Sequence, residues 1–459
     1  MKPLAPRAAS QPADLGWFGI VRLGFVQAAL GAIVVIATST MNRVMVVELA
    51  LPAMLPGALV ALHYAVQILR PRLGFGSDVG GRRTPWIIGG MAVLGLGGVL
   101  AALAIGLMAS ALTAGIALSV LAFLLIGVGV GSAGTSLLVL LAKRVDPSRR
   151  AAAATIVWLM MIAGFVVTTV VVGNLLDPYS APRLVLITLA VALAALAITL
   201  LATWGLEGHG IGHQQGEADD KPPFLQALRE VWAESRARRF TIFVFISMLA
   251  YSAQDLILEP FAGSVFGFSP GESTRLAGTQ HSGVFVGMIL VALAGSGFRG
   301  RRFGSLQAWT IGGCLASALA LLALAFGGVI GAGWPLKANV FLLGAANGAF
   351  AVSAIGSMMS YASEGRASRE GVRMGLWGAA QAIAFGLGGF AGAAASDVTR
   401  GLVGSDGLAY ALVFAAEGLL FVVAAQLAAR LAPAAAATAD ATATAGSRRA
   451  DPNLTASLS

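Results

Sequence analysis

The stretch TPWIIGGMAVLGLGGVLAALAIGLMASALTAGIALSVLAFLLIGVGVGSAGTSLLVLLA, residues 84–142, contains no Asp, Glu, Lys or Arg. A helix crosses the hydrocarbon core of a bilayer in about 20 residues, so this run is long enough for two successive spans. The whole chain is also rich in apolar residues and poor in charge. Of its 459 residues, 57% are hydrophobic and 11% are charged, whereas about a quarter are charged in soluble domains. The sequence excludes a water-soluble globular protein and predicts an all-α polytopic membrane protein.

Charge-poor windows, divided by charged or Pro/Gly-rich breaks, predict twelve transmembrane helices. Their expected limits are 16–40, 49–76, 84–108, 112–142, 151–176, 183–206, 240–264, 275–298, 304–331, 336–362, 374–399 and 407–430. The expected organisation is a cytoplasmic N-terminal tail (1–15), an N-terminal six-helix bundle (16–206), a cytoplasmic linker with an amphipathic helix (207–239), a C-terminal six-helix bundle (240–431) and a disordered cytoplasmic tail (432–459).

The basic residues predict the orientation. The formal net charge is +9, and 24 of the 30 Lys and Arg residues fall in segments that are cytoplasmic if the N-terminus is cytoplasmic. The positive-inside rule then places both termini in the cytoplasm. Topology therefore accounts for the basic balance, and no clustered basic patch indicates nucleic-acid binding. The single cysteine, Cys314, excludes an intramolecular disulfide and a thiolate metal site, and no metal centre is expected.

The loop after the second predicted span reads GFGSDVGGRR, residues 74–83. Its glycines allow two helix ends to approach closely, and its carboxylate can accept hydrogen bonds from a helix N-terminus or pair with the arginines. Such a cluster can latch one conformation shut. The predicted conformational latch consists of Gly74, Asp78, Gly81, Arg82 and Arg83.

The second half of the chain repeats this loop. Residues 295–302, GSGFRGRR, match residues 76–83 at an offset of 219, with Gly297 in place of Asp78. The loop and its repeat resemble the signature of the major facilitator superfamily, although Val79 stands where that family has a basic residue. The resemblance implies two pseudo-symmetric six-helix bundles that rock around a central site near the bilayer midplane.

Polar residues at membrane depth are functional candidates by default, because burying them in lipid is costly. Asp255, Glu259, Gln254 and Gln381 form the predicted polar intramembrane site. Pro260 leaves two alternatives open, a discontinuous-helix binding site or a helix end with two solvated carboxylates. Further polar residues within predicted spans are Arg22, Gln27, His63, Gln67, Gln280, His281 and Glu417.

His63 and His281 lie on equivalent spans of the two halves, 218 residues apart. A neutral imidazole in an apolar span can be an axial ligand to the metal of a tetrapyrrole. The alternative is a hydrogen bond to a neighbouring helix. We take His63, Gln67 and His281 as pigment-binding candidates.

Asn42, Arg43 and Glu48 are expected at the outer ends of the first two spans, as an outer gate or as a simple loop ion pair.

Three further segments resemble the PucC and LhaA-type proteins of the superfamily, which deliver bacteriochlorophyll for light-harvesting assembly. They are MNRVMVVEL (41–49), QDLILEPFAG (254–263) and GVRMGLWGAAQA (371–382). The loop after the second span differs, and resembles a subgroup associated with late bacteriochlorophyll biosynthesis.

The resemblance implies a non-enzymatic protein of the inner (intracytoplasmic) membrane of a photosynthetic bacterium. It would bind bacteriochlorophyll or a late precursor non-covalently and hand it on. Its partners would be light-harvesting or reaction-centre polypeptides, or bacteriochlorophyll synthase. The rival hypotheses are a secondary transporter of a small solute and an assembly scaffold without a pigment site.

Overall fold

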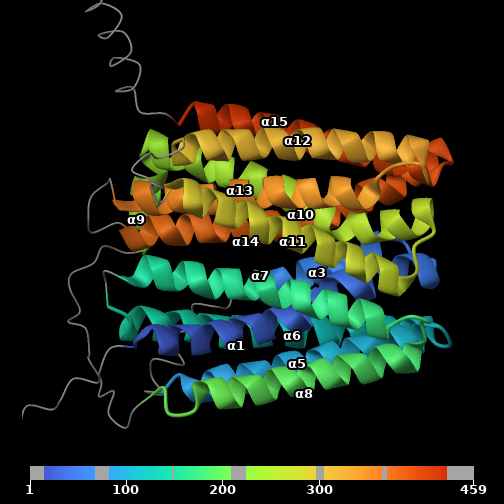
Figure 1. Cartoon of the computed structure of the whole chain (residues 1–459), viewed down its shortest axis with the longest axis horizontal. Coiled ribbons are helices and arrows are strands. Elements are labelled where there is room, and N and C mark those ends of the chain that lie inside the picture. Colours follow the sequence, from blue (N-terminus) through green and yellow to red (C-terminus); the bar gives the residue numbers. More distant parts are fainter. Residues whose placement is uncertain are drawn as a thin grey trace, which may run out of the picture.

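The computed structural model describes residues 15–67, 82–146, 149–207, 224–295, 304–363 and 370–431. Long helices run side by side, and their connections gather at two ends (Figure 1). We call the end where α1 begins and α15 finishes the terminal end, and the opposite one the distal end. The elements are α1 (Trp17–Val35), η1 (Ile36–Thr40), α2 (Met41–Arg43), η2 (Val44–Glu48), α3 (Met54–Val66), α5 (Thr84–Met108), α6 (Leu112–Arg144), α7 (Arg150–Leu175), α8 (Ala181–Thr203), α9 (Phe224–Ala233), α10 (Ser235–Phe266), α11 (Pro270–Gly295), α12 (Leu306–Ile330), α13 (Leu336–Ser363), α14 (Glu370–Val403) and α15 (Asp406–Ala429).

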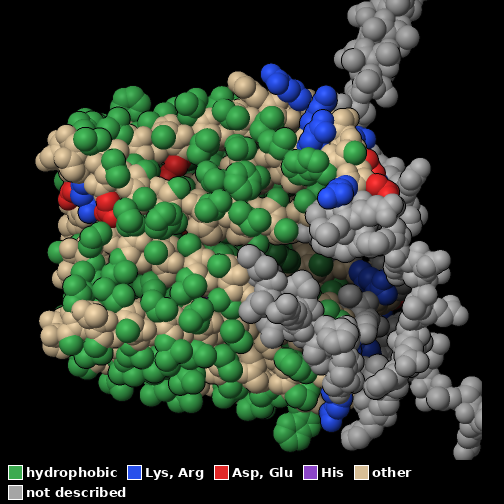
Figure 2. Space-filling model, turned by 180° about the vertical axis from the view of Figure 1, so that it is seen from behind, with side chains coloured by type: hydrophobic (Ala, Val, Ile, Leu, Met, Phe, Trp, Pro, Cys, Tyr) green, Lys and Arg blue, Asp and Glu red, His purple; other side chains and the backbone are tan. Residues whose placement is uncertain are grey.

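Within the described ranges, eleven helices are long and apolar enough to cross a membrane, and α3 is a shorter apolar helix. These correspond to the twelve predicted spans. Helices are suited to this role because the bilayer core offers no water to backbone N–H and C=O groups. Hydrophobic side chains cover the flank of the bundle (Figure 2), and Leu186, Leu193 and Leu319 are 66%, 59% and 68% exposed. The chain is therefore a multi-pass membrane protein.

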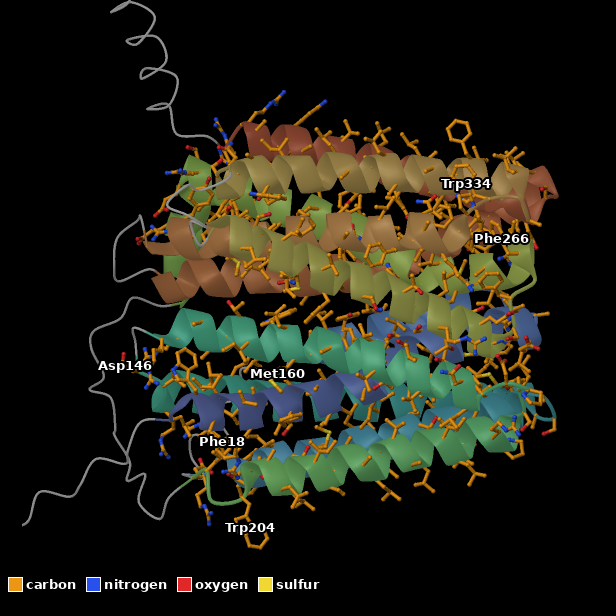
Figure 3. All side chains as sticks on the ribbon, in the orientation of Figure 1. Phe18, Asp146, Met160, Trp204, Phe266 and Trp334 are labelled. Atoms are coloured by element: carbon orange, nitrogen blue, oxygen red, sulfur yellow. The ribbon has the colours of Figure 1, made fainter. Side chains whose placement is uncertain are left out.

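The two ends of the bundle differ from its flank. Lys and Arg side chains gather at the terminal end (Figure 2). Phe18 and Trp204 lie towards the same end, whereas Phe266 and Trp334 lie towards the distal end (Figure 3). Phe18 is 76% and Trp204 79% exposed. Aromatic side chains at both ends of an apolar flank are typical of membrane–water interfaces.

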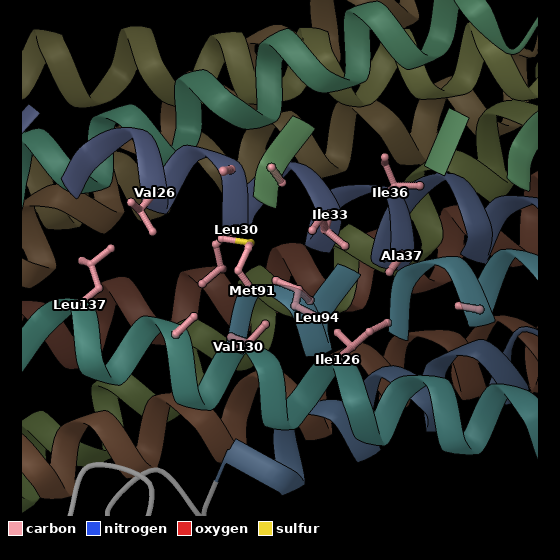
Figure 4. Packing of buried hydrophobic residues seen from close by; sticks show 14 of the residues in the cluster. Val26, Leu30, Ile33, Ile36, Ala37, Met91, Leu94, Ile126, Val130 and Leu137 are labelled. Atoms are coloured by element: carbon pink, nitrogen blue, oxygen red, sulfur yellow. The ribbon is translucent and has the colours of Figure 1, made fainter. Parts of the chain in front are cut away.

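Buried apolar side chains form two large clusters. The first joins the helices from α1 to α8, which we call the N-half, and also includes Leu256 of α10. The second joins the helices from α10 to α15, the C-half. Figure 4 shows the packing in the N-half, where Leu30 of α1, Met91 of α5 and Val130 of α6 meet. Each half therefore has its own apolar core. Polar side chains can face one another at the boundary between the two cores.

Three of the predicted limits that the structure corrects concern the first two spans and the predicted linker. The first span continues to Glu48 instead of ending at residue 40, because its polar residues have partners in the C-half. The next helix begins at Met54, not at residue 49. α10 begins at Ser235, so residues 235–239 of the predicted linker are helical; their arginines lie on the end of a long helix.

The rest of the predicted linker contains α9, in which Val231 is fully buried and Trp232 is 44% exposed. Both predicted tails lie outside the described residues, apart from Leu15 of the first.

A carboxylate fixes the start of α5. Glu207, which is 5% exposed, accepts hydrogen bonds from the backbone N–H of Arg83 at 2.6 and 2.8 Å and from that of Thr84 at 2.8 Å. The first N–H groups of a helix have no acceptor within it, and a negative charge there also interacts favourably with the helix dipole. Glu207 thus ties the end of the N-half's last helix to the start of α5.

We expect Glu207→Ala to lower the free energy of unfolding by about 1–2 kcal/mol, because the buried N–H groups lose their acceptor. Thermal unfolding in detergent micelles would measure this. Glu207→Gln, which keeps one acceptor oxygen, should lose less. Equal stability of the alanine variant and the wild type would contradict this role.

Candidate functional site between the two halves

The first membrane span is irregular near the distal end. Two π-helical segments, η1 and η2, flank the single α-helical turn of α2. Such segments inside helices are frequent at functional sites. Here they flank Asn42 and Arg43 of α2, which are 1% and 2% exposed. The expected outer-gate residues thus belong to the helix itself, and the expectation that they lie in a loop is wrong.

Asn42 completes a hydrogen bond that Pro260 removes. Proline has no N–H, so the carbonyl of Leu256, four residues earlier in α10, loses its helical donor. Asn42 Nδ2 donates to this carbonyl at 2.6 Å. α10 continues as a helix past Pro260 to Phe266, so neither the predicted break nor a helix end occurs there. The proline instead leaves the Leu256 carbonyl free to accept a hydrogen bond from Asn42 of the N-half.

Arg43 makes a wider connection. Its guanidinium donates to Glu48 on η2, to Ser273 Oγ of α11 at 3.3 Å and to the carbonyl of Phe268 at 2.6 Å. Burial raises the pKa of nearby Tyr179, and the negative charge of Glu48 raises it further against the opposing effect of Arg43. Arg43 therefore joins the halves, in addition to pairing with Glu48 within its own span.

Two aspartates that the sequence analysis missed add contacts at the same end. Asp397 of α14 accepts hydrogen bonds from the backbone N–H of Ala53 at 3.0 Å and of Met54 at 2.7 Å, and so caps α3. Asp177, between α7 and α8, accepts from Ser269 Oγ at 2.7 Å and pairs with Arg275 of α11 at 3.3 Å. Asp177 lies just before a proline, which is a turn signal, but nothing in the sequence reveals its partner.

The predicted polar site is partly assembled on α10. Gln280 Nε2 of α11 donates to Asp255 Oδ1 at 3.3 Å. Gln254 is fully buried and Glu259 is 2% exposed, and their side-chain oxygens have no hydrogen-bond partner among the described residues. Gln381 of α14 is half-buried. These groups are unusual in a membrane interior, where polar side chains are normally paired.

The two histidines differ in what their ring nitrogens do. His63 Nε2 accepts a hydrogen bond at 2.9 Å from Gln67 Nε2, one turn later in α3. His281 Nδ1 instead donates to the carbonyl of Ala277 at 2.7 Å, and its ring meets Phe165 of α7 edge-on with centroids 4.9 Å apart. Among the described residues, the second arrangement uses Nδ1 and leaves the Nε2 lone pair available, whereas the first uses Nε2 itself.

His281 lies on the boundary between the halves. Phe165 belongs to an apolar cluster of α7 and α11 that includes Ile162, Val284 and Met288. A Cβ at Gly278, one turn before His281, would lie 2.7 Å from Thr169 Oγ1 of α7, so the two helices cross closely here. The imidazole is half-buried at this crossing.

Two of the five predicted latch residues, Arg82 and Arg83, lie within the described residues. Gly74, Asp78 and Gly81 lie outside the described residues. Arg82 is exposed, and Arg83 is 2% exposed, with its backbone held by Glu207. Their proposed role therefore remains a prediction.

A histidine that holds the metal of a tetrapyrrole would need a ring nitrogen with a free lone pair. A metal-binding histidine normally donates its other ring N–H to a carbonyl or carboxylate, which fixes the tautomer. The Nδ1–Ala277 bond of His281 meets this requirement. His63 fits less well, because its Nε2 already accepts from Gln67. The donor chemistry at His281 thus suits the group that the sequence analysis expects.

A double-mutant cycle tests the link between Asn42 and Pro260. Asn42→Ala should cost about 1–3 kcal/mol of stability, because it leaves the Leu256 carbonyl unpaired. In a Pro260→Ala background the restored N–H of residue 260 can pair with that carbonyl, so the same change should cost much less. Unfolding of all four variants in detergent gives the coupling energy, and additive effects would contradict the link.

Comparisons with known proteins agree with this architecture. The model of the PUCC protein family matches residues 40–436. The "Bacteriochlorophyll synthase 44.5 kDa chain" of Rhodobacter capsulatus is 56% identical over 415 residues, which cover 90% of this chain and 95% of the relative. "Protein PucC" of the same organism is 28% identical, with 90% and 92% covered.

Solved structures show the fold. The nucleoside transporter NupG has a TM-score of 0.63 at 15% identity, over 90% of this chain and 98% of the transporter. A bacterial homolog of the lysosomal transporter Spinster, inward-facing and occupied, has a TM-score of 0.64 at 15% identity, over 90% and 96%. Together with the family match over most of its length, these similarities show that the chain is a PUCC-family membrane protein with a major facilitator fold.

Proposed function

We propose that this protein binds bacteriochlorophyll, or a late precursor, non-covalently at the boundary between its halves and delivers it for assembly of photosynthetic complexes. The family and the name of the 56% identical relative support a role in the biogenesis of these pigment complexes. The recipients would be light-harvesting or reaction-centre polypeptides, with bacteriochlorophyll synthase as the donor or recipient of the pigment. The chain itself would perform no chemical reaction.

His281 carries this proposal. Its Nδ1–H is held by the Ala277 carbonyl, so Nε2 presents its lone pair from a half-buried position between α7 and α11. The His281 imidazole would hold bacteriochlorophyll through Nε2, and the pigment when bound would supply the magnesium ion that accepts this lone pair. The apolar wall of Phe165, Val284 and Met288 would exclude water from that bond.

Other polar residues at the boundary would orient the ligand. Asp255 and Gln280 already face each other, and the buried amide of Gln254 lacks a partner among the described residues. Gln381 is half-buried on α14. Tyr64 of α3 and Tyr251 of α10 both contact Phe385 of α14, at centroid distances of 5.6 and 5.8 Å. Planar rings and amides suit a large aromatic macrocycle with polar substituents.

We further propose that the terminal end is cytoplasmic and that the membrane is the inner (intracytoplasmic) membrane. The positive-inside rule supports this orientation, because Lys and Arg gather at that end (Figure 2). Asn42, Arg43 and Glu48 then act as an outer gate on the far side. His63 and Gln67 remain secondary candidates for pigment contact.

The rival function, secondary transport of a small solute, has one observation in its favour. Glu259 and Glu417 are 2% and 3% exposed, and their carboxyl oxygens have no hydrogen-bond partner among the described residues. Carboxyl groups in this state inside a bundle are also typical of ion or proton pathways.

The absorption spectrum of protein purified in mild detergent from a pigment-producing host tests the proposal. We expect a near-infrared band to co-purify with the wild type and to fall about tenfold in His281→Leu, a loss of roughly 1.4 kcal/mol of binding free energy. In His281→Gly, added imidazole should restore the band by replacing the missing ligand. His63→Leu removes the secondary candidate and should keep most of the band, because His281 would hold the metal.

Pigment lost from His63→Leu but kept in His281→Leu would move the site to α3. No pigment in the wild type, together with solute uptake that Asp255→Asn or Glu259→Gln abolishes, would favour the transporter. No pigment and no uptake would favour a scaffold.

A further inference from the structure

A cavity of about 160 Å³ lies at the terminal end of the C-half, away from the boundary site. It is bounded by the start of α10, the end of α13 and the start of α14, which meet beside α9 (Figure 1). A single water molecule needs only roughly 10–15 Å³ of such space, so the cavity can hold a larger group. The lining side chains with polar or aromatic groups are Glu234, Arg236, Phe240, Tyr361, Arg373 and Trp377.

Aromatic rings give this cavity fixed walls. Phe240 meets Tyr361 and Trp377 edge-on, with centroids 5.3 and 4.8 Å apart. The guanidinium of Arg236 lies over the Tyr361 ring, 4.4 Å from its centroid. Phe240 and Trp377 are each 1% exposed. The Phe240 and Trp377 walls are therefore part of the packed core.

An ion pair between a buried arginine and an exposed glutamate spans the lining. Arg373 donates from Nε to Glu234 Oε2 at 3.1 Å, and from Nη2 to Oε1 and Oε2 at 2.8 and 2.9 Å. The Arg373 side chain is 3% exposed and that of Glu234 is 41% exposed. A two-pronged bond of this kind is the geometry by which arginine recognises carboxylates and phosphates. The Glu234 carboxylate thus occupies the position in which Arg373 would bind another anion. Because the Glu234 side chain is exposed, it can turn toward solvent.

Two further kinds of donor line the same space. Trp377 Nε1 is buried and has no acceptor among the described residues, although an indole N–H is a donor that is normally paired when buried. α10 begins at Ser235 beside the cavity. The N–H groups of its first turn have no acceptor within the helix, and the positive end of the helix dipole lies there. The lining thus offers the indole N–H, the helix N-terminus and the guanidinium groups of Arg236 and Arg373 as donors, against one acceptor carboxylate, that of Glu234.

We propose that this cavity is a binding site for a phosphate group, either that of an anionic phospholipid headgroup or free inorganic phosphate. The phosphate oxygens accept hydrogen bonds from Trp377 Nε1–H, from Arg373 and from the first turn of α10. Glu234 releases Arg373 and turns toward solvent as the phosphate enters. A helix N-terminus with an arginine is a common setting for phosphate recognition. Since the cavity lies at an end of the spans, a lipid headgroup can reach it directly.

Isothermal titration of delipidated protein in neutral detergent tests this site. The probes are dihexanoylphosphatidylglycerol, inorganic phosphate and, as the zwitterionic comparison, dihexanoylphosphatidylcholine. We expect phosphatidylglycerol to bind and phosphatidylcholine to bind at least several-fold more weakly. Binding of inorganic phosphate with similar affinity would assign the site to the free anion, whereas binding of phosphatidylglycerol alone would assign it to the lipid.

Two substitutions should act in opposite directions. Trp377→Phe keeps the ring but removes the N–H donor, and should weaken binding about fivefold. Glu234→Gln removes the competing charge and should tighten binding, an effect that a misfolded variant would not produce. Arg430→Gln, which changes an exposed arginine at the same end, is the control and should bind like the wild type. Absence of binding to the wild type, or unchanged affinity in both cavity variants, would overturn the proposal.

Discussion

The carbonyl of Leu256 imposes the constraint on which the boundary between the halves depends. Pro260 deprives it of its helical donor, and an unpaired backbone group inside a membrane costs several kcal/mol. Asn42 supplies the donor from the N-half. The π-helical segments on both sides of α2 hold Asn42 and Arg43 in a continuous span, so that both reach the C-half. One missing N–H in α10 thus explains why a polar residue is buried in the first span.

Around this contact the distal end is held by further bonds across the boundary. Arg43 reaches Phe268 and Ser273, and Asp397 caps α3 from α14. Any motion that separates the halves at this end must break several of these bonds together. The pigment candidate His281 lies farther along α11, against Phe165 of α7. The arrangement places the candidate nitrogen, His281 Nε2, between helices of different halves, so relative motion of the halves would change its surroundings.

Residues 84–142 show how far sequence alone reaches. Their lack of charge predicted two spans, and α5 and α6 occupy the stretch with a short connection. Charge led the same reasoning to end the first span before Arg43 and to begin the seventh span after Arg236. Both arginines are helical, because Arg43 has hydrogen-bond partners in the C-half and Arg236 lies at the end of α10. Asp177 and Asp397 gave no signal, because their partners come from distant segments. The spacing of His63 and His281 paired the two residues without distinguishing them, whereas their hydrogen bonds to Gln67 and Ala277 do distinguish them.

An experimental structure of the protein, purified with its pigment from a pigment-producing host, tests the central claim most directly. The account predicts tetrapyrrole density between α7 and α11, with the magnesium ion at bonding distance from His281 Nε2 and the Asn42–Leu256 hydrogen bond present. Pigment bound on the outer, lipid-facing surface, or ligated by another residue, would contradict it.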